Sequence, residues 1–378
     1  MPDYKGGSIV NLMSSISHSF KAKSLYKELR ILPGNEIKSK NVVLLIIDGL
    51  GYEYLTKNHS ESLLNAHLLG SVTSVFPPTT SSAVTTFLTG VAPQQHAFTG
   101  WWVNLKEVGA VSIPLRFCTK KGKQSLSKYG LDITSILNQR AFTTKINAKN
   151  FVIQDRTIVN SDFSKEMSKN AKSLGYDTLE GMFKKIKKAI KSKGKRKYIY
   201  AYWSQLDHIA HEKGINHKKA DKHIKEIDKK LAKFIKTIKG TDTTLIVTAD
   251  HGHMESPLKR NIFLADHLKL KACLSTQLCG EKRTAYCYVH PSKAKQFENY
   301  VKNNLSKYFY LFKSQELIDK NFFGLFKENP KLFDRIGDYT LIAKENYLIS
   351  DDKDKKDIGQ HAGISKEEML VPLIIITC

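Results

Sequence analysis

Four short segments of this 378-residue chain carry aspartate and histidine side chains in patterns that suit divalent metal ions. They are IIDGLG with Asp48, LDHIAHEKG with Asp207 and His211, TADHGHM with Asp250 and His251, and GQHAG with His361. Catalytic zinc sites bind carboxylate and imidazole ligands and keep one position open for substrate. A lone aspartate after a strand commonly caps the next helix, but unrelated caps have no reason to recur beside histidines. The set therefore predicts a metal centre.

The spacing inside two of these segments also favours metal binding. Asp207 and His211 are four residues apart, so one helical turn would direct both side chains toward one ion. Asp250 and His251 are adjacent, and adjacent side chains at a strand end diverge toward two neighbouring sites. The neighbours interpreted as ordinary hydrogen-bonded or solvated histidines are His208 and His253.

A helix N-terminus rich in hydroxyl groups is predicted in the segment SVFPPTTSSAVTTFLTG. The Pro-Pro pair ends a short strand, and Thr79 and Thr80 fall in the first turn of the helix that follows. A threonine hydroxyl is a poor nucleophile at neutral pH, but a divalent cation lowers its pKa. The helix N-terminus supplies N–H groups and a positive dipole end for a phosphate oxygen. These residue types predict phosphoryl transfer.

The fold class expected is α/β, a mainly parallel sheet sandwiched by helices. Continuous apolar runs precede Asp48, Asp207 and Asp250, as in strands buried on both faces, and helical patterns alternate with them. Parallel sheets place ligands at the carboxyl ends of their strands. Residues 256–349 are less periodic and more aromatic, which predicts an inserted, smaller α+β cap. Residues 1–255 and 350–378 would form the catalytic metal-binding domain.

The order of these motifs resembles the alkaline phosphatase superfamily, in particular its type I phosphodiesterase and nucleotide pyrophosphatase family and a cytoplasmic bacterial branch of it. The similarity runs from IIDGLG through FPPTTSSAVTTFLTG, YAYWSQLDHIAHEKG and VTADHGHM to GQHAGISKEEMLVPL. It also includes the stretches FFGLF and RIGDYTLIA of the expected cap. The similarity therefore covers most of the chain.

The resemblance implies an alkaline-phosphatase-like fold, two divalent metal ions and a phospho-threonine intermediate. Zinc is the first choice of metal, and manganese or iron would also suit these ligands. The implied ligands of one ion are Asp207, His211 and His361, and those of the other are Asp48, Asp250 and His251. The implied nucleophile is Thr80 rather than Thr79, counting back from Thr89 and Gly90 as the family pattern requires.

One stretch departs from the family pattern. The chain reads QQHAFTGWWVN, so Ala97 stands where the family has glycine, and Trp101 stands where it has a phosphate-binding asparagine. Asn104 is a candidate to replace that asparagine as a substrate contact. Trp101 and Trp102 would either stack on a base or wall the pocket.

The composition bears on partners and compartment. The formal net charge is +24, but only eight of the 60 basic residues are arginine. Nucleic-acid and phosphate readers favour arginine for its planar fork, so a lysine bias is more typical of compositional drift, and a nucleic-acid partner is not expected. Five cysteines without a CxxC spacing argue against a disulfide framework or a thiolate zinc site, and favour a reducing cytoplasm. No apolar segment is long enough to predict a signal peptide or a membrane span.

The function expected is hydrolysis of phosphodiester or pyrophosphate bonds in a small, nucleotide-like phosphorylated substrate. A phosphomonoesterase or phosphonate hydrolase of the same superfamily is the alternative, followed by a catalytically weak basic binding protein. Diesters are expected to be preferred because no arginine or lysine lies near Thr80 in sequence. Distant arginines that folding could bring there are Arg140, Arg156 and Arg283. The substrate itself and the oligomeric state are left open by the sequence.

Overall fold

The centre of the molecule is a seven-stranded sheet with the order β2-β18-β9-β1-β8-β6-β7. The computed structural model describes residues 1–351, 353 and 357–378. The strands are β1 (Asn41–Ile47), β2 (Leu68–Thr73), β6 (Lys149–Asp155), β7 (Ala171–Tyr176), β8 (Lys197–Trp203), β9 (Thr243–Thr248) and β18 (Leu370–Thr377). Strand β18 is antiparallel to both of its neighbours, and the pairings of β1, β6, β7, β8 and β9 are parallel. The predicted mainly parallel sheet is confirmed.

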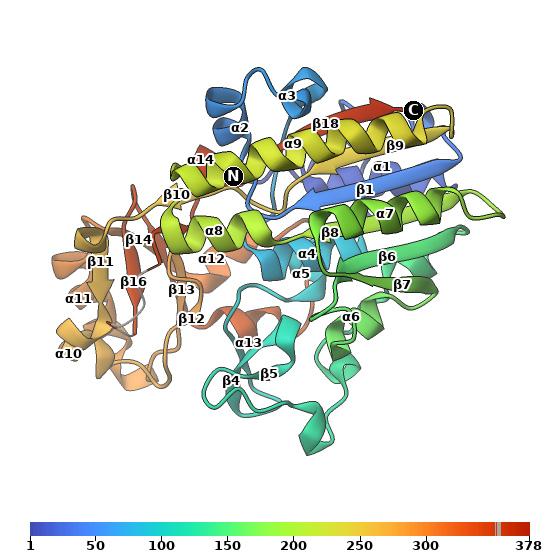
Figure 1. The fold of residues 1–378 in the computed structure, drawn as a ribbon. Helices are drawn as coiled ribbons and strands as arrows, with labels where there is room; N and C mark the ends of the chain where they lie inside the picture. Colours follow the sequence, from blue (N-terminus) through green and yellow to red (C-terminus); the bar gives the residue numbers. More distant parts are fainter. Residues whose placement is uncertain (352, 354–356) are drawn as a thin grey trace.

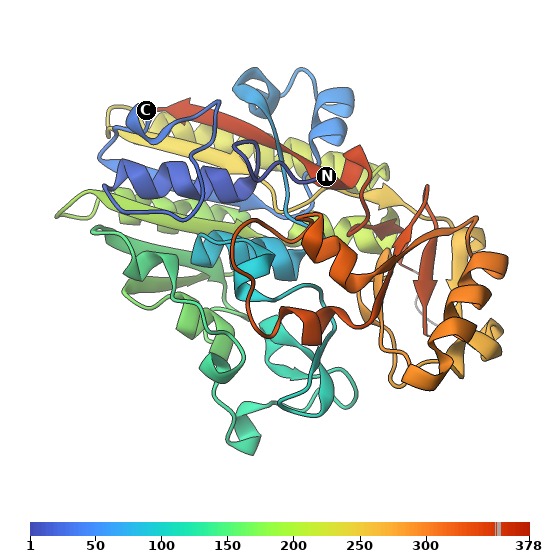
Figure 2. The same cartoon turned by 180° about the vertical axis from the view of Figure 1, so that it is seen from behind.

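Helices cover both faces of this sheet. Helices α7 (Leu179–Ile190), α8 (Gln205–Lys213) and α9 (Lys218–Ile238) lie on the face toward the viewer in Figure 1. Helices α1 (Ile9–Ser19) and α4 (Thr80–Thr89) lie on the opposite face, which Figure 2 shows. Every residue of β1, β8 and β9 is buried. Continuous apolar runs suit such strands because neither face of the sheet meets solvent.

The carboxyl ends of β1, β8 and β9 meet at one edge of the sheet. Ile47 pairs with Trp203, and Ile46 pairs with Thr248, so the three parallel strands end at nearly the same level. Asp48 follows β1 directly. Asp207 lies in the first turn of α8 rather than at the last residue of β8, because the helix begins two residues after the strand.

Residues 256–349 build a second, smaller sheet with the order β12-β13-β15-β14. Its antiparallel strands are β12 (Cys279–Gly280), β13 (Thr284–Cys287), β14 (Phe309–Lys313) and β15 (Tyr339–Ala343). Helix α11 (Ala294–Asn304) buries Phe297 and Val301 against this sheet in a core of its own. The orange segments of Figure 1 show this unit beside the main sheet.

A third hydrophobic cluster joins the smaller unit to the main body. Phe76, just before α4, packs against Phe322 and Phe323, with ring centroids 5.1 and 5.3 Å apart. The cluster also includes Ala97 and Leu332 of α13 (Leu332–Ile336). The smaller unit therefore rests on the loops that flank α4 through buried side chains.

A small three-stranded sheet bridges the two units. It consists of β3 (Val103–Leu105), β4 (Ala110–Ile113) and β5 (Cys118–Thr119). Just before β3, the backbone of Trp102 exchanges two hydrogen bonds with Gly280 of β12, with N···O distances of 3.2 and 2.6 Å.

The remaining elements are short. They include α2 (Tyr52–Asn58), α3 (Leu63–Ala66), α5 (Pro93–His96), α6 (Asp162–Met167), α10 (Leu268–Lys271), α12 (Ser314–Asp319), α14 (Lys366–Met369), β10 (Met254–Glu255), β11 (Asn261–Phe263), β16 (Leu348–Ser350) and β17 (Gly359–Gln360). In the part of the chain that the structure describes, no helix has the length and apolar character needed to cross a membrane.

Candidate active site

Two groups of carboxylates and imidazoles lie side by side at the carboxyl edge of the main sheet. The first is Asp207, His211 and His361, and the second is Asp48, Asp250 and His251. A third possible group, Asp207, His251 and His253, shares one residue with each of them. Within each group the potential ligand atoms all lie within 4.8 Å of one another. The structure thus brings together all six side chains that the sequence had selected, from segments as distant in the chain as β1 and β17.

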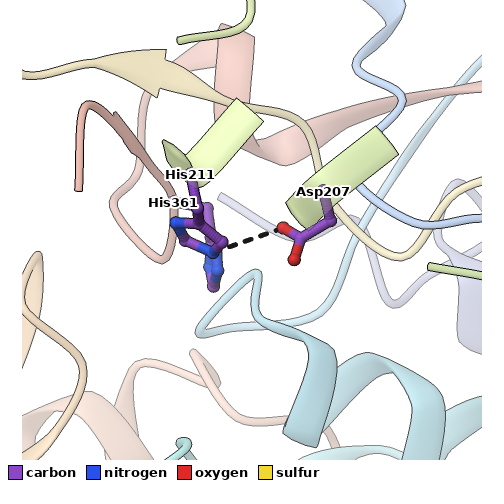
Figure 3. Close-up of side chains that lie close together, drawn as sticks. All are labelled: Asp207, His211 and His361. Atoms are coloured by element: carbon purple, nitrogen blue, oxygen red, sulfur yellow. Dashed lines mark ion pairs between the residues drawn. The ribbon is translucent and has the colours of Figure 1, made fainter. Parts of the chain in front are cut away.

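The first group is built on α8. His211 follows Asp207 by one helical turn, and His211 Nε2 lies 3.3 Å from Asp207 Oδ1. His361 comes directly after β17 and reaches the same place, as Figure 3 shows. The helical spacing predicted from the sequence is therefore present, and a histidine distant in sequence completes the group.

The second group is buried below the strand ends. His251 Nε2 lies 3.4 Å from Asp48 Oδ1 and 3.5 Å from Asp250 Oδ2. The three residues are at most 1% exposed. Asp48 is not the N-cap of the following helix, which is Gly51. Its carboxylate is therefore available for a role other than helix capping.

The three imidazoles make the same kind of hydrogen bond. The Nδ1 atoms of His211, His251 and His361 lie 2.8, 3.0 and 3.2 Å from the backbone oxygens of Gly359, Gly252 and Pro78, respectively. A backbone carbonyl accepts a hydrogen bond from a protonated Nδ1, and in the neutral ring this leaves Nε2 with its lone pair. Metal-binding histidines are commonly oriented in this way. Burial, followed by the charges of His251 and His211, also holds the pKa of His361 well below its ordinary value and so favours the neutral, metal-binding form.

The electrostatics of the second group fit a bound cation. Burial, followed by the charges of Asp207 and Asp250, raises the pKa of the Asp48 carboxyl well above its ordinary value. Asp48 Oδ1 and Asp250 Oδ2 are buried and have no hydrogen-bond partner among the described residues. Buried carboxylate oxygens without a partner are costly unless a cation compensates them. The residues present therefore fit a divalent ion.

In the first group the pKa of the aspartate is shifted in the opposite direction. Burial alone would raise the pKa of Asp207, but the charge of His211 and the hydrogen bond with His253 outweigh it and hold the pKa well below its ordinary value. Asp207 is therefore an ionised carboxylate, the form that binds a metal.

Thr80 is the first residue of α4, and its Oγ1 lies 3.2 Å from His251 Nε2. Thr79 is the N-cap residue, but its side chain makes no capping hydrogen bond. Thr79 Oγ1 instead donates to Glu281 Oε1 at 2.5 Å. The first-turn N–H groups of α4 are therefore not capped by the side chain that precedes them, and they lie next to the Thr80 hydroxyl.

Three residues near the six side chains were not recognised in the sequence as part of the site. His253 is 4% exposed and hydrogen-bonded to Asp207, so the ordinary hydrogen-bonded role expected for it holds, but at a position inside the centre. The Tyr202 hydroxyl donates to Asp48 Oδ2. Glu281 comes from the smaller unit, and no spacing in the sequence relates it to Thr79. His253 was the one with a visible signal, because it stands two residues after His251.

The two expected substrate contacts lie in different places. The backbone N–H of Trp101 donates to Glu281 Oε1 at 2.7 Å, and the Arg116 guanidinium lies 5.4 Å from the Trp101 ring centroid. Trp101 is therefore connected to Thr79 through one carboxylate. Asn104 lies on β3 and lines a separate surface cavity with Gly109, Thr119, Gln124 and Gln277, among others, and none of the residues lining that cavity is one of the six side chains.

One comparison with known proteins shows the family of this chain. The family model for type I phosphodiesterase / nucleotide pyrophosphatase matches residues 42–365. Among proteins of curated function, none matches the sequence.

Solved structures of similar fold include a murine ectonucleotide pyrophosphatase / phosphodiesterase 5, an inactive form in complex with AMP. It has a TM-score of 0.67 at 18% sequence identity, over 88% of this chain and 87% of that one. The human ectonucleotide pyrophosphatase / phosphodiesterase 5 has a TM-score of 0.67 at 17% identity, over 88% of this chain and 87% of that one. A phosphonoacetate hydrolase from Sinorhizobium meliloti, in complex with phosphonoformate, has a TM-score of 0.63 at 16% identity, over 88% and 89%.

Proposed function

Because the chain belongs to the type I phosphodiesterase / nucleotide pyrophosphatase family and is thus a phosphoester hydrolase, we propose that it cleaves phosphodiester or pyrophosphate bonds of a nucleotide-like substrate. The observation that carries this proposal is the position of the Thr80 hydroxyl, 3.2 Å from His251 Nε2, beside two groups of metal-binding side chains. A hydroxyl at a helix N-terminus next to such groups suits phosphoryl transfer.

We assign one divalent ion to Asp207, His211 and His361. The second ion is assigned to Asp48, Asp250 and His251. Zinc is the first choice, and manganese or iron would also accept this set of oxygen and nitrogen ligands. The Nδ1 hydrogen bonds, which leave each Nε2 with its lone pair, and the unpartnered carboxylate oxygens support the assignment. When bound, such ions neutralise charge on phosphoryl oxygens and lower the pKa of a nearby hydroxyl.

The chain's own residues then account for binding and bond exchange. The uncapped N–H groups of the first turn of α4 donate to a non-bridging phosphoryl oxygen and orient the phosphorus toward Thr80. Thr80 Oγ1 forms a bond to phosphorus as the bond to the leaving oxygen breaks, and the hydroxyl proton passes to solvent. The leaving oxygen takes a proton from solvent. Water then attacks the phospho-threonine, and the bond between phosphorus and Thr80 Oγ1 breaks to restore the hydroxyl.

The neighbouring structures support a small phosphorylated substrate. The murine ectonucleotide pyrophosphatase / phosphodiesterase 5 was solved in complex with AMP, which favours a nucleotide-like ligand here. Trp101 and Trp102 are available to stack on its base. The phosphonoacetate hydrolase was captured with phosphonoformate, which keeps phosphonate hydrolysis as the second candidate. For the compartment, the five free cysteines support a reducing cytoplasm.

The positions of the distant arginines support a preference for diesters. Arg156 pairs with Asp177 on the surface, at 2.6 Å, and Arg140 is exposed. Arg283 is buried and paired with Glu368. Efficient hydrolysis of a monoester needs extra positive charge on its dianionic phosphoryl group, and these three arginines are engaged elsewhere or exposed to solvent.

A pair of nitrophenyl substrates tests the function. Metal-loaded protein should hydrolyse a nucleotide nitrophenyl ester with a higher kcat/KM than nitrophenyl phosphate. Release of nitrophenol, followed by absorbance, gives both values. A clear preference for the monoester would favour a phosphatase instead, and no turnover of either ester by protein that binds metal would favour the binding protein.

A further inference from the structure

A carboxylate from the smaller unit is hydrogen-bonded to the residue that precedes the candidate nucleophile. Glu281 occupies the turn between β12 and β13, and its Oε1 accepts hydrogen bonds from Thr79 Oγ1 at 2.5 Å and from the Trp101 N–H at 2.7 Å. Thr79 immediately precedes Thr80. The Glu281 carboxylate is therefore connected by one hydrogen bond to the residue next to the hydroxyl proposed to attack phosphorus.

The hairpin that carries Glu281 is held in place by close contacts on two sides. Gly100 and Gly280 approach so closely that a Cβ on Gly100 would lie 2.6 Å from the Gly280 Cα. The Tyr286 hydroxyl donates to the Thr99 oxygen at 2.9 Å. On the other side, Thr284 Oγ1 donates to the Ala362 oxygen at 2.5 Å, next to His361. The carboxylate is therefore fixed between α4 and the His361 loop rather than free on the surface.

In the part of the chain that the structure describes, no basic side chain pairs with Glu281. Among the described residues, none of the ion pairs includes Glu281. The two lysines closest in the neighbouring cavity are already engaged, because Lys120 pairs with Asp351 at 3.0 Å and Lys282 pairs with Asp357 at 2.9 Å. Glu281 lines that small cavity, of about 60 Å³, together with Trp102 and Lys120.

The hydrogen bonds at Glu281 favour its ionised form. Burial has the largest effect and raises the pKa of the Glu281 carboxyl above its ordinary value, although the hydrogen bonds from Thr79 and Trp101, and then the charges of His211 and His251, lower it. Both hydrogen bonds are donated to the carboxyl group, as a carboxylate requires. The influence of the two histidines also places Glu281 within electrostatic range of both metal-binding groups.

We propose that Glu281 is a specificity residue that selects phosphoryl groups with one negative charge over those with two. The inference rests on the proposed function and names the charge class of its substrate. A fixed negative charge repels a doubly charged phosphoryl group about twice as strongly as a singly charged one. Phosphodiesters carry one charge at the phosphorus, whereas monoesters carry two near neutral pH. The site therefore disfavours monoesters through this carboxylate.

Glu281→Gln separates the charge from the hydrogen bonds. The glutamine Oε1 still accepts from Thr79 and Trp101, so the hairpin stays attached while the charge is lost. Glu281→Met removes the charge at similar length and serves as the second variant. Glu298→Gln is the matched control, because Glu298 is a half-buried glutamate of the same unit that accepts from the Tyr339 hydroxyl, at 2.8 Å.

The first measurement is binding, which does not depend on turnover. Isothermal titration of metal-loaded protein at pH 8.5 compares phenylphosphonate, which carries two charges, with its monomethyl ester, which carries one. Glu281→Gln should bind phenylphosphonate about tenfold more tightly relative to the ester than the unmodified protein does. Glu281→Met should change the ratio in the same direction, and Glu298→Gln should leave it unchanged. A ratio that is unchanged in Glu281→Gln overturns the proposal.

The second measurement is the kcat/KM ratio of nitrophenyl phosphate to the nucleotide nitrophenyl ester. This ratio should rise about tenfold in Glu281→Gln. If the unmodified protein hydrolyses neither ester, the proposed function fails, and the binding ratio still decides the role of Glu281. A purely structural role, in which Glu281 only fastens the hairpin to Thr79, would give wild-type ratios in Glu281→Gln and an equal loss for both ligands in Glu281→Met, and would overturn the proposal.

Discussion

His253 Nε2 lies 2.9 Å from Asp207 Oδ1, although His253 belongs to neither of the two ligand groups assigned above. The imidazole is 4% exposed, and its Nδ1 has no hydrogen-bond partner among the described residues. Gly49, at φ +77°, makes room for it, because a Cβ there would lie 2.7 Å from His253 Nε2. With its proton on Nε2, His253 donates to Asp207 and fixes the direction of the carboxylate.

The first prediction follows from this contact. His253→Ala should weaken metal binding at the Asp207 group by about 10- to 100-fold, because an outer hydrogen bond that orients a ligand is lost. Competition with a chromogenic chelator measures the affinity of each site. His208→Ala is the matched control, since His208 is exposed on the same helix as Asp207. Equal affinities in the two variants would show that His253 does not orient Asp207.

The two adjacent threonines should behave differently. Thr80→Ala should lower kcat/KM by about 1,000-fold or more, because the attacking oxygen is removed, with little change in stability. Thr79→Val should keep activity within about tenfold, since the Thr79 side chain makes no cap bond. Steady-state rates and thermal unfolding of both variants provide the test. Loss of activity in Thr79→Val, with activity kept in Thr80→Ala, would identify Thr79 as the nucleophile.

Local patterns in the sequence predicted that the segments carrying the candidate ligands would meet, and the structure brings the six side chains together. Buried strands read as continuous apolar runs, and the carboxyl ends of parallel strands meet at one edge, so Asp48 and Asp250 could be expected together. The predicted position of Asp207 was less accurate. The apolar run stops at Trp203, and whether the next residues form a loop or a helix depends on their packing against β17.

Glu281 could not be predicted from the sequence. Its partners Thr79 and Trp101 lie about 200 and 180 residues away, and the contact exists because a hairpin of the smaller unit docks at Gly100. A glutamate in a turn has no periodicity, and solvent exposure is the ordinary expectation for it. The same limit applies to Tyr202, whose place in the continuous buried run of β8 indicates burial but not its hydrogen bond to Asp48.

Metal content is the third prediction. The purified protein should hold two divalent ions per chain, and Asp48→Asn and His361→Ala should each lower the content by about one ion, because each removes a ligand from a different group. Chelation should abolish turnover, and added zinc or manganese should restore it. Elemental analysis of dialysed protein measures the content. A metal-free protein that added zinc and manganese do not activate would contradict the assignment of both groups.

The last prediction concerns the stability of the connection between the smaller unit and the C-terminal segment. Arg283, two residues after Glu281, is 1% exposed and binds Glu368 through Nε–Oε1 and Nη2–Oε2 contacts of 2.6 and 2.9 Å. Its Nη1 also donates to the Tyr347 oxygen at 2.6 Å. Glu368→Ala would leave a buried guanidinium without its counter-charge, so it should lower the free energy of unfolding by about 3–5 kcal/mol.

A double variant and a control variant show whether the loss of stability comes from an uncompensated buried charge. Removing both partners, with Arg283→Met and Glu368→Met together, should cost less than Glu368→Ala alone, because no uncompensated charge remains. Arg156→Ala, which breaks an exposed pair with Asp177, should leave the urea midpoint nearly unchanged. Urea denaturation followed by fluorescence measures all three variants. If Glu368→Ala were as stable as Arg156→Ala, the buried pair would not be holding the hairpin that carries Glu281 to the segment that carries His361. The fixed position of the Glu281 carboxylate would then depend on the contacts at Gly100 and Thr284.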